Sequence, residues 1–405
     1  MSEMSYLEKL LDGVEVEWLP LGEVSALRRG RVMSKGYLTE NFGPYPVYSS
    51  QTANNGKIGS INTFDFDGEY ISWTTDGANA GTVFYRTGKF SITNVCGLIT
   101  LKNKYPLIYK FLFYWLTIEA KKHVYSGMGN PKLMSHQVEN IPVPVPCPDN
   151  PEKSLAIQSE IVRILDKFTA LTAELTAELT AELNMRKKQY NYYRDQLLSF
   201  DESSVEWKTL LEACDYVDYR GKTPKKTQSG IFLVTAKNIR MGYIDYHASQ
   251  EFISEEDYAI VMRRGLPKKG DVLITTEAPC GFVAQVNREN IALAQRVIKY
   301  RSKNTQLSNS FLKHYLLGSQ FQDKLMQAAT GSTVKGIKGS RLHQLKIPIP
   351  SKVEQDRIVA ILDKFDTLTN SITEGLPREI ELRQKQYEYY RDLLFSFPTP
   401  ETVSN

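Results

Sequence analysis

The sequence predicts an α+β protein in which two mixed α/β globules are separated by two long antiparallel helices that form a coiled-coil spacer. Two observations carry this prediction. A helical segment occurs twice at an offset of 197 residues, and each copy follows a run of strand-like segments. The 405 residues also exceed one ordinary domain, which has roughly 100–200 residues. A chain ordered globule, helix, globule, helix has pseudo-two-fold symmetry when it is closed into a circle.

The N-terminal segment, residues 1–17, is acidic and polar, so it does not have the pattern of a secretory signal. Its YLEKLLDG stretch resembles YRDLLFSF, which ends the second helical copy. We therefore expect residues 1–17 to complete the second helical region, as the circular arrangement requires.

The two globules are expected at 18–150 and 207–350. Each opens after a Val-Glu-Trp triplet and contains strand-like runs bounded by turn residues. Each then has a late apolar helix, at about 106–122 in the first globule and 308–328 in the second. Each closes with a glycine-rich loop, a His-Gln pair and an Ile-Pro run. GEYISWTT in the first globule resembles GDVLITTE in the second.

The helical regions are expected at 151–206 and 351–405. IVRILDKFTALT in the first matches IVAILDKFDTLT in the second at nine of twelve positions. The first copy has no Pro or Gly from Glu152 to Phe200, which predicts roughly 70 Å of uninterrupted helix at 1.5 Å per residue. The second copy contains a glycine and a proline near position 376, so we expect a kink or a restart there.

A finer repeat lies inside the first copy, where TAEL occurs three times in tandem at 172–183. Apolar residues consequently recur every four positions, and the second copy keeps the same track without TAEL. Matched tracks favour two helices that pack on each other antiparallel. Two amphipathic helices with ordinary core faces are the alternative. The expected packing residues are Leu171, Leu175, Leu179, Leu183, Leu368, Ile372, Leu376 and Ile380.

The net charge of +4 conceals an uneven distribution. The two globules carry +4 and +10, whereas each helical region carries −3 and the N-terminal segment −4. Basic globules joined to acidic helices suit a protein that binds a polyanion with its globules and faces protein partners with its helices.

No catalytic constellation stands out. The GKT at 221–223 follows Tyr216 where a phosphate loop requires glycine, and neither HExxH nor a strand-linked GxGxxG occurs. The five histidines lack metal-ligand spacing and the four cysteines form no CxxC pair. For His136 and His343, at equivalent junctions, a structural role is the simpler interpretation. We expect a binding protein without its own active site, cofactor or metal, in a reducing cytoplasm.

Polar loops with basic and amide side chains remain as candidates for function. Arg and Lys pair with guanine, Asn and Gln pair with adenine, and Lys also holds phosphates. Any one such loop is more typical of a solvated surface turn, but several in each globule favour contact with a DNA groove. The expected DNA-binding residues of the first globule are Lys35, Ser50, Gln51, Asn54, Asn55, Lys57, Asn79, Asn130 and Lys132. Those of the second globule are Arg220, Lys222, Lys225, Lys226, Lys237, Asn238, Arg240, Thr333, Lys335, Lys338 and Arg341.

Taken together, these features resemble the DNA-specificity subunit of type I restriction-modification enzymes, of the IC class with TAEL spacer repeats. The resemblance covers nearly the whole chain. It rests on the duplicated ILDKF and KQYxYYRD helices, the TAEL tandem, the TAKNIRMGYID and GSTVKGI segments, and the IPVP and IPIP leads. The helix duplication with TAEL is highly specific, whereas the globule motifs are less so because recognition domains vary.

The resemblance implies that each globule is a target-recognition domain for one half of an asymmetric, bipartite site in double-stranded DNA. The helices would set the gap between the halves and dock two modification subunits, which carry S-adenosylmethionine and methylate adenine. Two restriction subunits would translocate and cleave DNA with ATP and Mg. None of that chemistry would lie in this chain, which is expected in the bacterial cytoplasm in association with DNA and not with a membrane.

Two alternatives from other classes stay open. A coiled-coil interaction scaffold without sequence-specific DNA binding would explain the helices, but the basic charge of the globules speaks against it. A self-sufficient methyltransferase or nuclease would require cofactor motifs that the sequence lacks.

Overall fold

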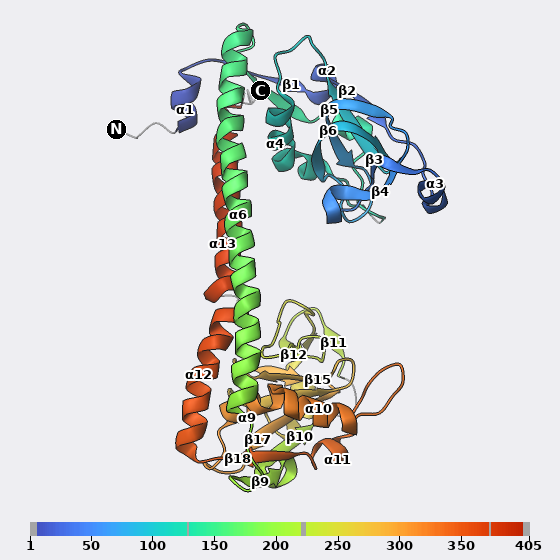
Figure 1. The fold of residues 1–405 in the computed structure, drawn as a ribbon. Coiled ribbons are helices and arrows are strands. Elements are labelled where there is room, and N and C mark those ends of the chain that lie inside the picture. The colour runs from blue at the N-terminus through green and yellow to red at the C-terminus, as the bar shows by residue number, and fades with distance from the viewer. Residues whose placement is uncertain (1–5, 128, 220–223, 372–373, 400–405) are drawn as a thin grey trace. The chain divides into compact units, whose positions relative to one another are not determined.

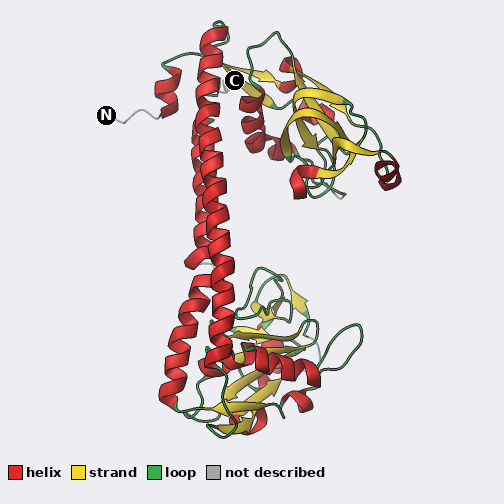
Figure 2. Cartoon of the chain, viewed as in Figure 1, coloured by secondary structure: helices red, strands yellow, loops and turns green. Residues whose placement is uncertain are grey.

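The protein is described from a computed structural model, which describes residues 6–127, 129–219, 224–371 and 374–399. Contacts divide the chain into two compact units. Unit 1 comprises residues 1–174 and 383–405, and unit 2 comprises residues 175–382. Each unit combines a mixed α/β globule with parts of the long helices, so the predicted fold class is confirmed (Figures 1 and 2).

The globule of unit 1 is built on a six-stranded sheet in the order β2-β7-β5-β6-β3-β4. β3 and β6 are parallel, and the other neighbouring strands are antiparallel. Helix α4 packs against β5 and β6, and β1 pairs with β8 in a separate two-stranded ribbon. The strands are β1 (Val16–Pro20), β2 (Ser25–Arg29), β3 (Phe42–Tyr48), β4 (Lys57–Ile61), β5 (Phe66–Thr74), β6 (Val83–Ile92), β7 (Cys96–Leu101) and β8 (Pro142–Pro146). The helices of this globule are α2 (Leu21–Val24), α3 (Lys35–Glu40), η1 (Ala53–Gly56), α4 (Tyr109–Glu119), η2 (Ala120–His123) and α5 (Ser135–Val138).

Trp73 on β5 organises the core of this sheet. Its side chain is buried, and its indole N–H donates to the carbonyl of Leu133 at 3.0 Å. The neighbouring strand contributes Gly97, where an added Cβ would lie 2.1 Å from the indole ring. Glycine at this position is therefore required by the close approach of the Trp73 ring.

The globule of unit 2 has two four-stranded sheets, in the orders β10-β17-β14-β15 and β11-β13-β12-β16, and a β9-β18 ribbon. Helix α9 packs against β14 and β15, in the way that α4 packs in unit 1. The strands are β9 (Glu206–Thr209), β10 (Cys214–Asp218), β11 (Lys226–Thr227), β12 (Ile231–Val234), β13 (Phe252–Ile253), β14 (Val272–Thr276), β15 (Cys280–Gln285), β16 (Ile291–Leu293), β17 (Val297–Ser302) and β18 (Lys346–Ile349). The helices are α7 (Leu210–Ala213), α8 (Glu255–Val261), η3 (Met262–Arg264), α9 (Asn309–Leu317), α10 (Ser319–Ala328) and α11 (Gly339–Leu342).

Three long helices account for the predicted spacer. Helix α6 is continuous over Pro151–Leu197, as the absence of interior Pro and Gly predicts. The second copy is broken into α12 (Lys352–Asn370) and α13 (Gly375–Leu394), as expected. Gly375 has φ +78°, and a Cβ there would lie 2.6 Å from the carbonyl oxygen of Thr367, so the break depends on glycine.

Aromatic contacts join the long helices in each unit. In unit 1, Phe168 of α6 lies 5.7 Å from Tyr390 of α13, measured between ring centroids. In unit 2, Tyr193 of α6 lies 5.8 Å from Phe365 of α12. The two pairs correspond at the 197-residue offset with the helices exchanged. In unit 1, Ile157 and Ile161 near the start of α6 also share a buried cluster with Leu394 at the end of α13, so these two helices run antiparallel there.

None of the described residues of the predicted leucine track is fully buried. Leu171 is 51% exposed, so its side chain does not belong to a buried seam. Ile372 lies outside the described residues. The remaining residues of the track are half-buried, namely Leu175, Leu179, Leu183, Leu368, Leu376 and Ile380.

A buried glutamine attaches each globule to its long helix. In unit 1, Gln158 of α6 is fully buried; its Oε1 accepts from the N–H of Ile108 at 3.0 Å, and its Nε2 donates to the carbonyl of Pro106 at 2.6 Å. In unit 2, Gln355 of α12 accepts from the N–H of Ser308 at 2.8 Å and donates to the carbonyl of Gln306 at 2.7 Å. The same clamp is thus built twice, at the start of α4 and of α9.

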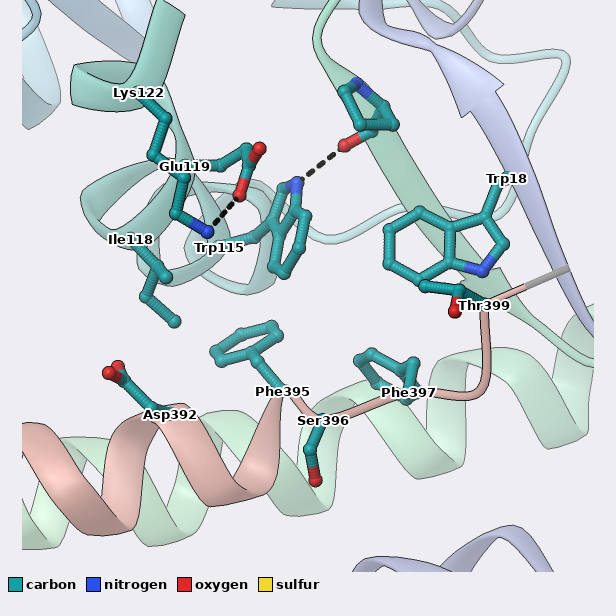
Figure 3. A pocket seen from close by; sticks show the side chains of 11 residues that line it. Trp18, Trp115, Ile118, Glu119, Lys122, Asp392, Phe395, Ser396, Phe397 and Thr399 are labelled. Carbon is teal, nitrogen blue, oxygen red and sulfur yellow. Dashed lines mark hydrogen bonds and ion pairs between the residues drawn. The ribbon is translucent and has the colours of Figure 1, made fainter. Parts of the chain in front are cut away.

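Residues near both ends of the described chain pack into the core of unit 1. Leu7 and Leu11 of α1 (Tyr6–Leu11) are buried in the same cluster as Phe395 and Phe397. Figure 3 shows the two phenylalanines facing the indole rings of the globule. Trp18 donates from its indole N–H to the carbonyl of Pro398 at 2.8 Å. These two tryptophans and two phenylalanines, Trp18, Trp115, Phe395 and Phe397, line a hollow of about 570 Å³, which is called the tail hollow below.

Candidate nucleic-acid interface

Three of the predicted polar loops of unit 1 meet at one end of its sheet. The side-chain amide of Asn79, after β5, donates to the carbonyl of Ser50, after β3, at 3.0 Å. The N–H of Gly77 donates to the carbonyl of Pro131 at 3.0 Å, and a β-bridge joins Asp76 to Lys132. Loops that are far apart in the sequence therefore form one continuous polar edge.

Arg86 links the loops of this polar edge to the sheet. Its guanidinium is buried, stacks on the Tyr48 ring at 3.6 Å, and donates to the carbonyl of Asn55 at 2.8 Å and to the hydroxyl of Ser72 at 3.0 Å. Burial lowers the pKa of Arg86 to about 10, so it stays charged at neutral pH. This arginine was not singled out from the sequence, because its role depends on contacts between strands.

The predicted DNA-binding residues of unit 1 fall into two groups. Ser50, Gln51 and Asn79 are half-buried; the Gln51 amide donates to the carbonyl of Lys57, and Asn79 and Ser50 are joined as described. They shape the loops. The exposed members are Lys35, Asn54, Asn55, Lys57, Asn130 and Lys132.

Asn54 and Asn55 form the turn of η1 with φ of +50° and +53°. Asn tolerates this left-handed region better than most residues, and both side chains are exposed. Lys35 begins α3, which packs against β4, so it lies beside the hairpin edge that this turn closes.

Asn238 of unit 2 is placed differently from its prediction. Its side chain is fully buried. Its Oδ1 accepts from the N–H of Thr235 at 3.0 Å, and its Nδ2 donates to the carbonyls of Asp245 and Ser249 at 2.9 and 2.8 Å. An amide with these partners has no group left for a base edge, so the prediction that Asn238 contacts DNA is wrong. Its bonds close the turn that exposes Lys237.

A hollow of about 490 Å³ lies beside that turn. Two predicted residues line it, Lys226 and Lys237. Gln295 and Arg296, between β16 and β17, line it as well and were missed from the sequence. The pair QR stands next to a short buried strand, which was the only available indication. This unit 2 hollow also has an apolar floor, formed by Leu233, Ala236 and Ala294.

Ion pairs engage two of the predicted cations of unit 2. Lys226 Nζ lies 2.9 Å from Glu251 Oε2, and Arg240 Nε lies 3.6 Å from Asp245 Oδ2. Arg240 is half-buried, so it supports the same loop as Asn238.

The loop at 330–341 is joined to the chain next to the unit 2 hollow, because Gly336 forms a β-bridge with Glu277, which precedes the lining residue Ala278. The Arg341 guanidinium donates to the carbonyl of Ala328 at 3.3 Å. The predicted residues here and on the neighbouring loop are exposed, namely Lys225, Thr333, Lys335, Lys338 and Arg341. Arg220 and Lys222 lie outside the described residues.

Other kinds of site find little support in the described part of the chain. Within it, no group of three or more His, Cys, Asp and Glu side chains could hold a metal ion. The four cysteines are free. No helix among the described residues is both long and apolar enough to cross a membrane. His343 is buried, and its Nδ1 lies 2.6 Å from the Tyr300 hydroxyl, in keeping with a structural role.

The family model for the type I restriction modification DNA specificity domain matches residues 13–185 and 207–382. The chain belongs to the family of type I restriction-modification DNA specificity subunits. Membership confirms the predicted function, a subunit that supplies DNA specificity and not catalysis.

Known specificity subunits match this one over their full length. The EcoR124I/EcoR124II specificity subunit of Escherichia coli is 43% identical, and the match covers 100% of both proteins. A putative type I restriction enzyme specificity subunit of Haemophilus influenzae is 34% identical over 97% of this chain and 98% of its own. A chain from a solved structure, described as the basis of complex assembly and conformational transition of the type I R-M system, has a TM-score of 0.59. At 16% identity over 94% of this chain and 97% of that one, it shows the fold alone.

Proposed function

We propose that the specificity subunit reads an asymmetric, bipartite target in double-stranded DNA, one half with each unit. In this proposal residues 18–150 and 207–350 are target-recognition domains. Residues 151–206 and 351–405, together with 1–17, form the spacer that fixes a non-specific gap between the halves.

One observation carries the proposal: the two units share a scaffold and differ in the loops on it. The N–H of Thr75 donates to the carbonyl of Val95 at 3.0 Å in unit 1, and the N–H of Thr276 donates to the carbonyl of Arg296 at 2.9 Å in unit 2. The side chains displayed beside these equivalent contacts differ in kind. Asn94 and Val95 stand at this contact in unit 1, whereas Gln295 and Arg296 stand there in unit 2. The exposed residues of the predicted set include three asparagines in unit 1 and none in unit 2. Different groups on one scaffold favour two different half-sites.

The proposed DNA contacts are the exposed residues of the predicted set. Lysines suit phosphates, and amides suit the major-groove edge of adenine. In unit 1 they are Lys35, Asn54, Asn55, Lys57, Asn130 and Lys132. In unit 2 they are Lys225, Lys226, Lys237, Thr333, Lys335, Lys338 and Arg341.

We further propose that two modification subunits dock on the helices. The support is a pair of exposed tyrosines at equivalent positions of the repeat, Tyr192 at 61% and Tyr389 at 64% exposure. Exposed aromatic side chains are frequent anchors of protein interfaces, and a duplicated anchor suits two copies of one partner. These partners would carry S-adenosylmethionine and methylate adenine. Two restriction subunits with ATP and Mg would complete the complex in the bacterial cytoplasm.

The IC class, with its TAEL spacer, is the finer assignment that we propose. It is supported by the full-length match to the EcoR124I/EcoR124II subunit and by the TAEL tandem inside continuous α6.

Mapping methylated adenines in cells that express this chain with a modification subunit tests the proposal. We expect a single motif with two unlike halves and a constant gap. A continuous motif, or two identical halves, would contradict it. A gel-shift on random duplexes tests the alternative that the chain is a coiled-coil scaffold without sequence-specific DNA binding. Under the proposal, the binding should become more selective for sequence when the modification subunit is added.

A further inference from the structure

Two residues that line the unit 2 hollow have a left-handed backbone, Ala278 with φ +48° and Arg296 with φ +70°, and of these Arg296 carries the charged side chain. This region is usually occupied by Gly, Asn or Asp, since other L side chains are strained there. Strained residues persist where the surrounding structure holds them and are concentrated at functional sites. An arginine at this strained position therefore indicates that its side chain has a function.

The scaffold itself does not require this side chain. The contact that fixes the position is made by the backbone carbonyl of Arg296, which accepts from Thr276. Val95 makes the equivalent contact in unit 1 with an apolar side chain, and its φ is not positive. The charge and the left-handed backbone are thus particular to unit 2.

The surroundings of Arg296 resemble a surface that reads base edges. Its side chain is 54% exposed, and its Nε lies 3.8 Å from Glu277 Oε2, too far for a tight pair. Gln295 and Lys237 line the same hollow. Arginine, glutamine and glutamate are the side chains that match guanine, adenine and cytosine, respectively, in the major groove.

We infer that Arg296 is a specificity-determining residue of unit 2 that contacts a base edge, most simply a guanine, in the half-site read by that unit. This inference rests on the proposed function. Two carboxylates border the hollow, Glu251 as a lining residue and Glu277 beside Arg296. Lys226 pairs with Glu251, and Lys226 and Lys237 suit phosphates. Glu277 lies 3.8 Å from Arg296, where it would repel a phosphate but can accept from cytosine. The charge next to Arg296 therefore favours a base contact over a backbone contact.

Arg296→Gly is the informative variant because glycine suits φ +70° and removes only the side chain. Arg296→Lys keeps the charge but cannot form the two parallel hydrogen bonds of a guanidinium. Lys269→Ala is the matched control. This exposed lysine precedes β14, whereas Glu277 and the hollow follow the other end of that strand.

Each variant is expressed as the full chain with the modification subunit, and adenine methylation is sequenced over a library randomised in both half-sites. For Arg296→Gly and Arg296→Lys we expect preference at one base position of one half-site to fall about tenfold to hundredfold. The other half-site and the gap should not change, and Lys269→Ala should keep the parent motif.

Uniformly weaker methylation with an unchanged motif would overturn the inference and identify a phosphate contact, as would a lysine variant with the parent preference. An unchanged motif at the parent rate would also overturn it. Thermal melting of Arg296→Gly, expected at or above the parent midpoint, excludes misfolding as the cause. The parent chain distinguishes failure of this inference from failure of the proposed function. If the parent chain yields no bipartite motif, the proposed function fails. If the variants yield the parent's bipartite motif, only the role of Arg296 is refuted.

Discussion

Replacing Gln158 by alanine should destabilise unit 1 by about 2–4 kcal/mol. The side chain is fully buried and bonds the N–H of Ile108, the carbonyl of Pro106 and the hydroxyl of Ser154. Alanine leaves the two backbone groups without these partners, and each unsatisfied group in a buried setting costs about 1–3 kcal/mol. Because both groups are only half-buried, we take values near the lower end and add a small term for lost packing.

Hydrogen exchange measured by mass spectrometry on the full chain, across a series of urea concentrations, resolves the effect by unit. Peptides of unit 1 should lose protection at lower urea, whereas peptides of unit 2 should not. Gln158→Met separates the two contributions, because it restores most of the volume without the hydrogen bonds. Gln355→Ala should reproduce the loss in unit 2 alone, since Gln355 makes the equivalent bonds.

Gln189→Ala is the matched control on the same helix. Its half-buried side chain bonds only Arg186 among the contacts described, and surface changes of this kind stay within about 0.5 kcal/mol. If Gln158→Ala also stays within that range, or if it weakens both units equally, the clamp does not act as the geometry indicates.

Three further predictions concern the spacer, the tail and pH. Deleting one TAEL unit removes about 6 Å of helix and about 400° of rotation, which is one turn plus roughly the twist of one base pair, about 34–36°. Methylation mapping should therefore show a gap that is shorter by one base pair, with both half-sites unchanged. A gap of the original length or altered half-sites would refute this. Phe397→Ala should lower the free energy of unfolding of unit 1 by about 3 kcal/mol. This is the lower end of the range for Phe-to-Ala changes in a core, because the ring faces the tail hollow. Unchanged hydrogen-exchange protection of unit 1 would contradict the packing of this residue in unit 1. Burial holds the pKa of His314 below its ordinary value, so this group is neutral in folded unit 2, whereas the unfolded chain takes up a proton below a pH of about 6.5. Unit 2 should therefore lose stability as the pH falls through that value, and His314→Gln should flatten this slope; a parent chain without the slope would sink the idea.

Local sequence patterns predicted the helices well. The absence of interior Pro and Gly fixed the continuity of α6, and Gly375 fixed the break before α13, because these residues act on the backbone of their own turn. The aromatic pairs were not predicted. Leucine spacing drew attention to Leu171, which is exposed, since a period of four residues cannot show which face of a long helix meets a neighbour.

The loops were predicted less well because their arrangement depends on strands that are distant in the sequence. Asn238 was grouped with Lys237 as a polar residue of one loop, yet its side chain is buried and held by four hydrogen bonds. Its bonding partners lie up to eleven residues away, and no local pattern indicates them. Arg296 was missed for the same reason, because only the pairing of β14 with β17 brings it to the unit 2 hollow.

The internal repeat separates scaffold from recognition. The residues that attach a globule to its helix recur at the offset, as Gln158 and Gln355 do, and so do the aromatic pairs. At the strand ends the backbone contacts of Thr75 and Thr276 recur, while a side chain beside them changes from Val95 to Arg296. Side chains that the scaffold does not use are free to differ between half-sites, because changing them leaves the clamp and the core intact. The positions where the two units agree in backbone contact but differ in side chain are therefore the ones at which a substitution should alter the DNA sequence read without altering stability.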